Sequence, residues 1–370
     1  MKIRSIILLL LCLSCTGLTA DEGIYGRPVR KVTIPNIPGY VTLMGDFHMH
    51  SIYSDGSVLP VVRVNEIYRE GLNAMAITDH AEFLPIILEL PKNSNRANEL
   101  ASARAREINI VYANGTEITR DFGQDDLSAH FVCLFVNDVN RIEVPDTIDM
   151  LREAKKQGAF IFWAHPWVAD KKVWEENIPA IIKEGLLDGV EIMNQGWQSD
   201  EAFVWAMKNN LTILGNTDAH DPVFYGRPTT LIFAREKNAE SMREALFSGR
   251  TAVLNGASLY GREKYLSAMF FESVKVKSVN IQVTAAAPGK LIFSNNSDIN
   301  YRIIIDKTYL PINLRKEIII EANKDTFINI TNKTLSAGTS QVKLKFENAN
   351  MHTENGKSPV MEMILTVTVK

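Results

Sequence analysis

The hydrophobic positions of this chain follow two different periods, and the change between them falls near residue 270. Up to about residue 256, short apolar runs alternate with stretches whose apolar residues recur every three or four positions. The first kind of run is typical of buried strands and the second of amphipathic helices. Beyond residue 270, apolar and polar residues alternate one by one, which is typical of strands with one buried face. The pattern therefore predicts two structurally different units.

The first unit alternates seven predicted strands with predicted helices. The strands are expected at 43–50, 74–78, 110–118, 130–136, 160–165, 189–193 and 212–216. The helices are expected near 58–70, 96–108, 146–157, 176–185, 200–210 and 239–248. This order implies a parallel sheet covered by helices. Seven units favour closure, so we predict the α/β class and a distorted (β/α)7 TIM-like barrel, in which chemistry gathers at the carboxyl ends of the strands.

The second unit is predicted to be a C-terminal all-β sandwich, Ig-like, over residues 271–370. Its strands are expected within 274–283 and at 301–305, 317–321, 326–330, 341–346 and 361–369. Because it has few candidate catalytic groups, we expect a packing or spacer module, with a glycan- or partner-binding module as the alternative. The barrel is expected over 43–268, after a lead-in segment over 21–42 that contains an edge strand at 27–34.

Residues 1–20 have the three parts of a signal peptide. Two basic residues precede an apolar run over 6–13, and Leu18-Thr19-Ala20 follows as a plausible cleavage site. We therefore expect export to a bacterial periplasm or cell envelope. Lipid attachment at Cys15 is the alternative, although the residues before it fit a lipoprotein motif poorly. The apolar run is too short to span a membrane, which takes about 20 residues, and no other stretch is long enough.

The charge balance argues against an extended nucleic-acid surface. The chain has 40 basic and 43 acidic residues, a formal net charge of −3, and no long basic run. Two of its three cysteines lie in the predicted signal peptide. Only Cys133 remains, so no intramolecular disulfide is expected, and its apolar neighbours indicate a core position.

Side chains suited to metal binding stand at or near the ends of the predicted strands. His48 and His50 share one face of the first strand, because side chains at i and i+2 point the same way. Alone, this pair would fit a polar strand face equally well. However, six of the seven histidines in the chain stand at such positions, together with acidic residues. The complete set of candidate ligands is His48, His50, Asp55, His80, Glu117, His130, His165, Asp218 and His220.

Nine nitrogen and oxygen ligands without a thiolate suit divalent zinc, manganese or iron, and they disfavour calcium or a lone magnesium ion. Nine ligands are too many for one tetrahedral ion, so we expect two or three metal ions. A carboxylate such as Glu117 can bridge two of them. Paired ions stabilise the attacking and leaving oxygens of a phosphoryl displacement and lower the pKa of bound water.

The order of these motifs resembles that of the polymerase and histidinol phosphatase (PHP) superfamily over about residues 43–256. The motifs are His-x-His, Asp-Gly, Thr-Asp-His, Gly-x-Glu, His, His-Pro and Asp-x-His. The resemblance implies a distorted seven-stranded barrel and metal-dependent phosphoester hydrolysis by a hydroxide that bridges the ions, with no separate protein nucleophile. It also implies three ligand sets: His48, His50, Glu117 and Asp218; Glu117, His130 and His165; and Asp55, His80 and His220.

We therefore predict an exported, metal-dependent phosphoric ester hydrolase that acts on a small phosphate monoester or diester. Export disfavours histidine biosynthesis and polymerase proofreading. Two alternatives stay open. One is a metal-dependent hydrolase of another bond class, amide or lactone. The other is an envelope binding protein that uses the sandwich to contact a glycan or a protein partner.

Further residues near the motifs are weaker candidates. Arg227, Asn194 and Arg120 could bind substrate, Arg227 by forking a phosphate. A salt bridge or solvent-facing loop is the alternative for Arg227, and a turn cap is the alternative for Asn194. Asp46 and Asp79 lie beside ligands in the sequence and could orient imidazole rings by accepting a hydrogen bond from them. Two aromatic residues, Trp167 and Trp197, would either wall the pocket or pack in loops.

Overall fold

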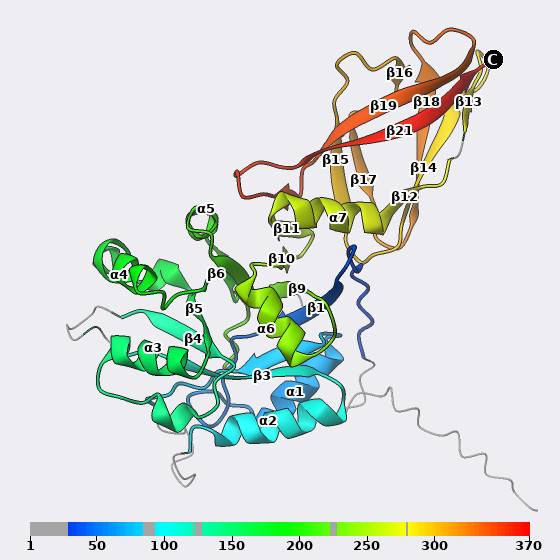
Figure 1. Ribbon diagram of the computed structural model, residues 1–370. Coiled ribbons are helices and arrows are strands. Elements are labelled where there is room, and N and C mark those ends of the chain that lie inside the picture. The colour runs from blue at the N-terminus through cyan, green and yellow to red at the C-terminus, as the bar shows by residue number, and fades with distance from the viewer. Residues whose placement is uncertain (1–28, 84–92, 121, 123–127, 223–227, 279) are drawn as a thin grey trace, which may run out of the picture.

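The computed structural model describes residues 29–83, 93–120, 122, 128–222, 228–278 and 280–370. The predicted signal peptide lies outside these residues. Figure 1 shows a unit with a curled sheet and outer helices, and a second unit made of strands, with α7 (Glu263–Ser273) between them. In the part of the chain that is described, no helix is long and apolar enough to cross a membrane.

The barrel unit is built on one 12-stranded curled sheet. Its strands are β1 (Val41–Asp46), β2 (Ala74–Ile77), β3 (Val111–Ile118), β4 (His130–Leu134), β5 (Phe160–Ala164), β6 (Gly189–Asn194), β7 (Trp197–Gln198), β8 (Thr212–Asn216), β9 (Thr229–Ala234), β10 (Thr251–Asn255), β11 (Ser258–Gly261) and β20 (Met351–His352). The order is β20-β11-β10-β9-β1-β2-β3-β4-β5-β6-β7, with β8 paired to β6. All seven predicted strands are present, with ends that differ by a few residues.

Helices lie around the outside of this sheet (Figure 1). They are α1 (Pro60–Arg69), α2 (Arg96–Glu107), α3 (Thr147–Lys156), α4 (Ile178–Lys183), α5 (Asp200–Lys208) and α6 (Ala239–Phe247), with shorter turns at Val139–Arg141, Pro166–Val168 and Val173–Asn177. Three of them begin at a side-chain cap: Asp146 accepts bonds from the first turn of α3, Ser199 from α5 and Asn238 from α6. Each of the six lies within its predicted range.

The sheet is mixed, and the expectation of a parallel sheet was wrong for several strands. β4 runs antiparallel to β3 and β5, and β9 runs antiparallel to β1 and β10. Closure depends on threonine side chains. The Thr230 hydroxyl accepts from the Gly215 amide at 2.9 Å and donates to the Gly215 carbonyl, while Thr251 donates to the Ile213 carbonyl at 2.8 Å. These side-chain contacts join β8 to β9 and β10, whereas the backbone ladder of β8 is with β6. The barrel is therefore distorted where β8 meets β9 and β10.

The predicted edge strand at 27–34 was also wrong over its described part. Residues 29–34 form no strand. Their backbone makes isolated bonds instead, from the Arg30 amide to the Arg69 carbonyl and from the Asp298 amide to the Thr33 carbonyl. A ladder needs a neighbouring strand with free pairing groups, and this segment crosses a helix end and a loop.

The second unit is a β-sandwich of a four-stranded and a five-stranded sheet. Its strands are β12 (Val274–Val276), β13 (Ile281–Val283), β14 (Gly289–Asn295), β15 (Tyr301–Ile305), β16 (Ile312–Asn313), β17 (Glu317–Ile320), β18 (Asp325–Asn332), β19 (Gly338–Asn348) and β21 (Val360–Val369). The sheet orders are β12-β14-β18-β16 and β13-β21-β19-β15-β17. Alternate residues of these strands are buried between the sheets, as the sequence pattern predicted.

The two units share a core and one strand pairing. A single apolar cluster includes Phe233 and Leu259 of the barrel sheet, Phe270 of α7 and Phe346 of the sandwich. The two-residue strand β20, in the connection between β19 and β21, pairs in parallel with β11. The predicted boundary between residues 268 and 271 falls within α7. The sandwich is therefore packed into the end of the barrel rather than attached by a linker.

Candidate metal centre

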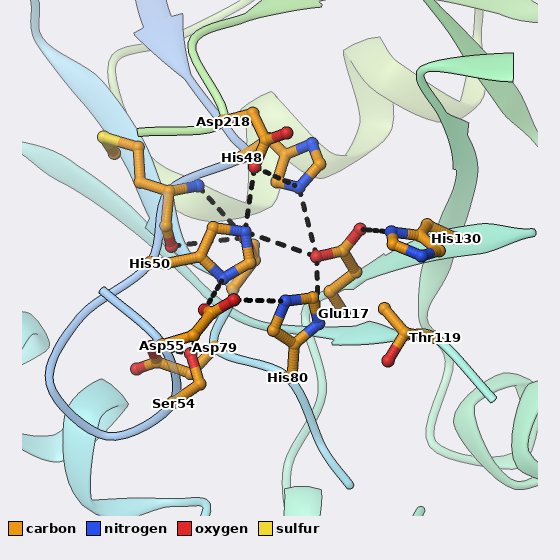
Figure 2. A network of polar contacts seen from close by, with 12 residues as sticks. His48, His50, Ser54, Asp55, Asp79, His80, Glu117, Thr119, His130 and Asp218 are labelled. Atoms are coloured by element: carbon orange, nitrogen blue, oxygen red, sulfur yellow. Dashed lines mark hydrogen bonds and ion pairs between the residues drawn. The ribbon is translucent and has the colours of Figure 1, made fainter. Parts of the chain in front are cut away.

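All nine predicted ligands meet at the carboxyl end of the barrel strands. Seven of them lie on or just after strands: His48 and His50 after β1, His80 after β2, Glu117 in β3, His130 in β4, His165 after β5, and Asp218 after β8. Asp55 and His220 come from the loops that follow β1 and β8. Figure 2 shows imidazoles from separate strands directed at the Glu117 carboxylate. The barrel topology therefore gathers side chains that are up to 172 positions apart, from His48 to His220.

Glu117 is the centre of this cluster. Its Oε2 lies 3.2 Å from Nε2 of His48, 3.3 Å from Nε2 of His50 and 3.2 Å from Nδ1 of His80. Its Oε1 lies 3.1 Å from Nδ1 of His130 and 3.6 Å from Nε2 of His165. One buried carboxylate thus faces five imidazoles, an arrangement suited to a bridging ligand.

The other two carboxylates stand on opposite sides of His50. Oδ1 of Asp218 lies 3.0 Å from Nε2 of His50 and 3.3 Å from Nε2 of His48. Asp55 lies 3.5 Å from Nδ1 of His50, and its Oδ2 lies 3.3 Å from Nε2 of His80 and 3.2 Å from Nε2 of His220.

Four groups of side chains offer ligand atoms within 4.8 Å of one another. They are His50, Asp55, His80 and His220; His48, His50 and Glu117; His48, His165 and Asp218; and Glu117, His130 and His165. Two of the three sets that the family resemblance implies recur in these groups, one of them with His50 added. The remaining set, around His48, is divided between two groups. The assignment of ligands to individual ions stays a prediction.

The imidazole nitrogens are placed as metal ligands rather than as hydrogen-bonding groups. Several are buried and have no hydrogen-bond partner among the described residues: both nitrogens of His50, Nε2 of His48, and Nδ1 of His80 and His165. Buried polar atoms are normally paired, because an unpaired one keeps the full penalty of desolvation. Most of these nitrogens stand close to carboxylate oxygens but are not aligned as donors to them. This is the geometry of lone pairs directed at a shared cation.

The electrostatics of the cluster explain how its charges are tolerated. Burial would lower the pKa of His48, but the Asp218, Glu117 and Glu191 carboxylates outweigh it and raise that pKa well above its ordinary value. In the same way burial would lower the pKa of His50, but the nearby Asp218 and Glu117 carboxylates outweigh it and raise that pKa to about 9. Burial would raise the pKa of Glu117, but His48 and His80 hold it well below the ordinary value. Without metal, protons on the imidazoles balance the carboxylates.

Glu191 is a functional residue that the sequence analysis missed. It is fully buried in β6, with Oε1 lying 3.3 Å from Nδ1 of His48. Its other bonds are accepted from the His165 amide at 2.8 Å and from the side chains of Asn194 and Asn216 at 2.8 and 2.9 Å. A His48 Nδ1–H that donates to Glu191 leaves Nε2 free to act as a ligand. The available signal was a lone acid in the otherwise uncharged strand 189–194.

Asp46 and Asp79 hold loops rather than imidazoles. Asp46 accepts bonds from the amides of His48 and Thr217 at 3.3 and 3.2 Å and from the Thr217 hydroxyl at 2.6 Å. Asp79 accepts from the Ser51 amide and hydroxyl, both at 2.6 Å, and from the Ser54 hydroxyl at 2.7 Å. Among the described residues neither carboxylate bonds to a histidine ring, so the expected role in orienting imidazoles belongs to Glu191.

Two ligands adopt a backbone conformation that non-glycine residues rarely adopt. His165 has φ 29° and Asp218 has φ 49°. Such conformations persist only where the surroundings enforce them, and they gather at functional sites. The His165 amide is held by Glu191, so the same buried carboxylate fixes the backbone of one ligand and the ring of another.

A cleft of about 600 Å³ opens over the ligands. Besides metal-binding side chains, its lining includes Asn194, Trp167 and Trp197, which for the two tryptophans is one of the two placements that the sequence left open. Arg120 does not line it; the Arg120 backbone bonds instead to Glu82 and Thr147. Arg227 lies outside the described residues.

Comparisons with known proteins agree with this geometry. A family model described as PHP-associated matches residues 196–251. A two-domain protein from Bacteroides vulgatus, described as containing a predicted PHP-like metal-dependent phosphoesterase, is 30% identical with a TM-score of 0.81, over 92% of this chain and 99% of that one. DNA polymerase/3'-5' exonuclease PolX of Bacillus subtilis is 24% identical over an alignment of 242 residues that covers 60% of this chain. The chain spans only 41% of the length of PolX.

Proposed function

The chain belongs to the PHP superfamily, as a metal-dependent hydrolase, and we propose that it hydrolyses a small phosphate monoester or diester outside the cytoplasm. The observation that supports this most directly is the arrangement around Glu117, where one carboxylate faces five imidazoles. A bridging carboxylate with histidines on both sides suits two or three divalent ions of zinc, manganese or iron.

The nine ligands would hold the ions at the bottom of the cleft. When bound, such ions would supply positive charge for the phosphoryl oxygens and would activate water for attack near neutral pH. The residues of the chain supply position. Glu191 orients the His48 ring and the His165 backbone, while Asp46 and Asp79 fix the loops that carry Thr217 and Ser51. The cleft wall excludes part of the solvent around the ester.

The cellular setting and partners belong to the same proposal. Residues 1–20 support export to the periplasm or cell envelope. A small phosphorylated substrate fits a cleft of about 600 Å³, which lies within the range of small-molecule sites. Contact between the sandwich and a glycan or protein is a separate proposal.

A substrate panel on metal-reconstituted protein tests this function. The purified protein is stripped with a chelator, reloaded with Zn, Mn or Fe, and given phosphomonoesters, phosphodiesters, amides and lactones. We expect release of phosphate or of an alcohol from phosphoesters, dependent on metal and lost in Asp218→Ala. Glu201→Ala, an exposed acid on α5, is the matched control and should remain active. Turnover of amides or lactones without turnover of any phosphoester would refute the proposal.

A further inference from the structure

We propose that the mouth of the metal cleft is a subsite for a flat aromatic group, with Trp197 as its stacking surface. The preferred substrates would then be phosphoesters that carry an aromatic group next to the phosphate. The inference rests on the proposed function for the place of the phosphate, but the aromatic subsite can be tested by binding alone.

The first observation is a set of exposed apolar side chains around the cleft. Trp197 is 72% exposed, Val168 66% and Phe83 44%, and all three line the same opening above the ligands. Single exposed apolar residues are ordinary on protein surfaces, but several around one concave opening mark a binding site. The indole ring of Trp197 is therefore accessible to an apolar group of a ligand in the cleft.

The apolar rim is continuous with the metal cluster. The Phe83 ring lies against the imidazole of His80, with ring centroids 4.2 Å apart. Trp197 belongs to another part of the cleft lining. Its backbone pairs with that of Asn194, which also lines the cleft and donates from its side chain to Glu191. If the metal centre holds the phosphate of a substrate, the group attached to that phosphate lies next to these aromatic side chains.

The second observation is that the backbone of Trp197 is paired in a hairpin, although its side chain is exposed. It lies in a short hairpin in which β7 pairs with β6, turning at Gln195 with φ 55°. Behind the hairpin, the Gln198 side chain donates to Asp200 at 2.6 Å and lies near the Tyr260 hydroxyl. The Tyr260 ring stacks on His352 of β20, with centroids 4.3 Å apart. A ligand that stacks on Trp197 therefore needs little ordering of the backbone that carries the ring.

The third observation is the charge of the lining. Among the residues described around this cleft, none is Lys or Arg. A second phosphate or a carboxylate on the substrate would find no cationic partner on the described wall, whereas a neutral aromatic ring needs none. Aromatic stacking is tolerant of ring type, so the subsite selects a chemical class rather than one compound.

Calorimetry with two phosphonates tests the subsite without relying on catalysis. Phenylphosphonate and methylphosphonate share a head group and differ in the ring. On metal-loaded protein we expect phenylphosphonate to bind about tenfold more tightly, a difference of about 1.4 kcal/mol. Trp197→Ala should remove that ratio and leave the affinity for methylphosphonate unchanged, while Trp197→Phe should keep most of it.

The control is Phe327→Ala, which removes a 58% exposed ring from the sandwich and should change neither affinity. Equal affinities in the unmodified protein, a ratio that survives Trp197→Ala, or no binding of either phosphonate would overturn the proposal. Melting curves identify any variant that fails to fold, and Trp197→Phe then provides the test.

Hydrolysis separates this inference from the proposed function. Benzyl phosphate, whose alcohol leaving group is about as basic as that of glycerol phosphate, should be cleaved with about tenfold higher kcat/KM than glycerol phosphate, and Trp197→Ala should remove the difference. Phosphonate selectivity without hydrolysis of any ester would refute the proposed function and leave the subsite standing. Ester hydrolysis without aromatic selectivity would refute the subsite and leave the function standing.

Discussion

The barrel and the sandwich bury different kinds of side chain. At the carboxyl end of the barrel strands, fully buried titratable groups such as His48, His50 and Glu191 stand side by side. In the sandwich, the buried polar residues of the described chain are neutral: Asn295, Ser297, Asn348 and Thr353. Buried charge destabilises a fold unless it is paired or binds a metal. The comparison indicates that the barrel end is arranged for chemistry and the sandwich for packing.

One of the buried neutral residues in the described part of the sandwich is not hydrogen-bonded through its side chain. Asn348 is fully buried, and neither its side-chain nitrogen nor its oxygen has a hydrogen-bond partner among the described residues. We have no physical account of it. It carries no charge, so the contrast in buried charge between the two units holds.

The largest effect should come from removing a ligand. His48→Ala and Asp218→Ala should each lower turnover by more than about a hundredfold, the scale on which one electrostatic group supports a transition state. Metal content, measured by elemental analysis, should fall with it. A barrel cluster that kept full activity in both variants would not be the active site.

A core substitution in the sandwich should lower stability and leave metal binding unchanged. Phe346 is fully buried, with its ring centroid 5.4 Å from that of Phe270 in α7. Phe346→Ala should lower the free energy of unfolding by about 3–5 kcal/mol, through lost contacts and a cavity. Metal content per folded molecule should stay unchanged. Denaturant unfolding measures the first quantity, and a loss of metal without loss of stability would break the comparison.

An effect of intermediate size is expected at Glu191. Glu191→Gln keeps the shape of the side chain but removes the charge that faces His48, and it replaces by a donor one of the two oxygens that accept from His165 and Asn216. Metal affinity should fall by about 10- to 100-fold, as for other groups that orient metal-binding histidines. Competition with a chelator gives the affinity. Glu201→Gln is the exposed control, and equal affinities in the two variants would remove Glu191 from this role.

The smallest effect is the pH dependence of the metal-free protein. Because the folded-state pKa of His50 is raised to about 9 from an ordinary 6.5, its protonated form stabilises the fold fully below about pH 6.5. That contribution is lost as pH rises through 9. The melting temperature in chelator should therefore fall from pH 7 to 9, while the affinity for metal rises, because metal displaces those protons. A melting temperature that rose over this range without metal would contradict the assignment.

Local pattern was sufficient for much of this structure. The seven strands and the nine converging side chains were predictable because strand ends in such a barrel meet at one face, and His-x-His or Asp-x-His spacing is local. The direction of β4 and the pairing of β9 with β1 were not, since strand direction depends on distant partners. Glu191 was missed for the same reason: its role comes from His48, which is 143 positions away.

The substrate side was less predictable than the metal side. Asn194 and Trp197 reach the cleft because β6 turns back tightly into β7, a hairpin with no strong local signal around Gln195. Arg120 follows a ligand in sequence, yet its backbone is held by Glu82 and Thr147 away from the cleft. Position in the sequence predicted the metal ligands well because they lie at the ends of regular strands. It did not predict the location of side chains in the loops beyond those strands.

The strand β20 has a consequence for how this protein is made. Residues 351–352 supply the pairing for β11, residues 258–261, so the edge of the first unit is completed from nearly the end of the chain. A chain that emerges from a ribosome or a translocation channel cannot finish its first unit before most of the second has followed. Vectorial synthesis would thus leave the pairing edge of β11 without its partner strand for the length of some 90 residues, an interval in which a chaperone would find it accessible.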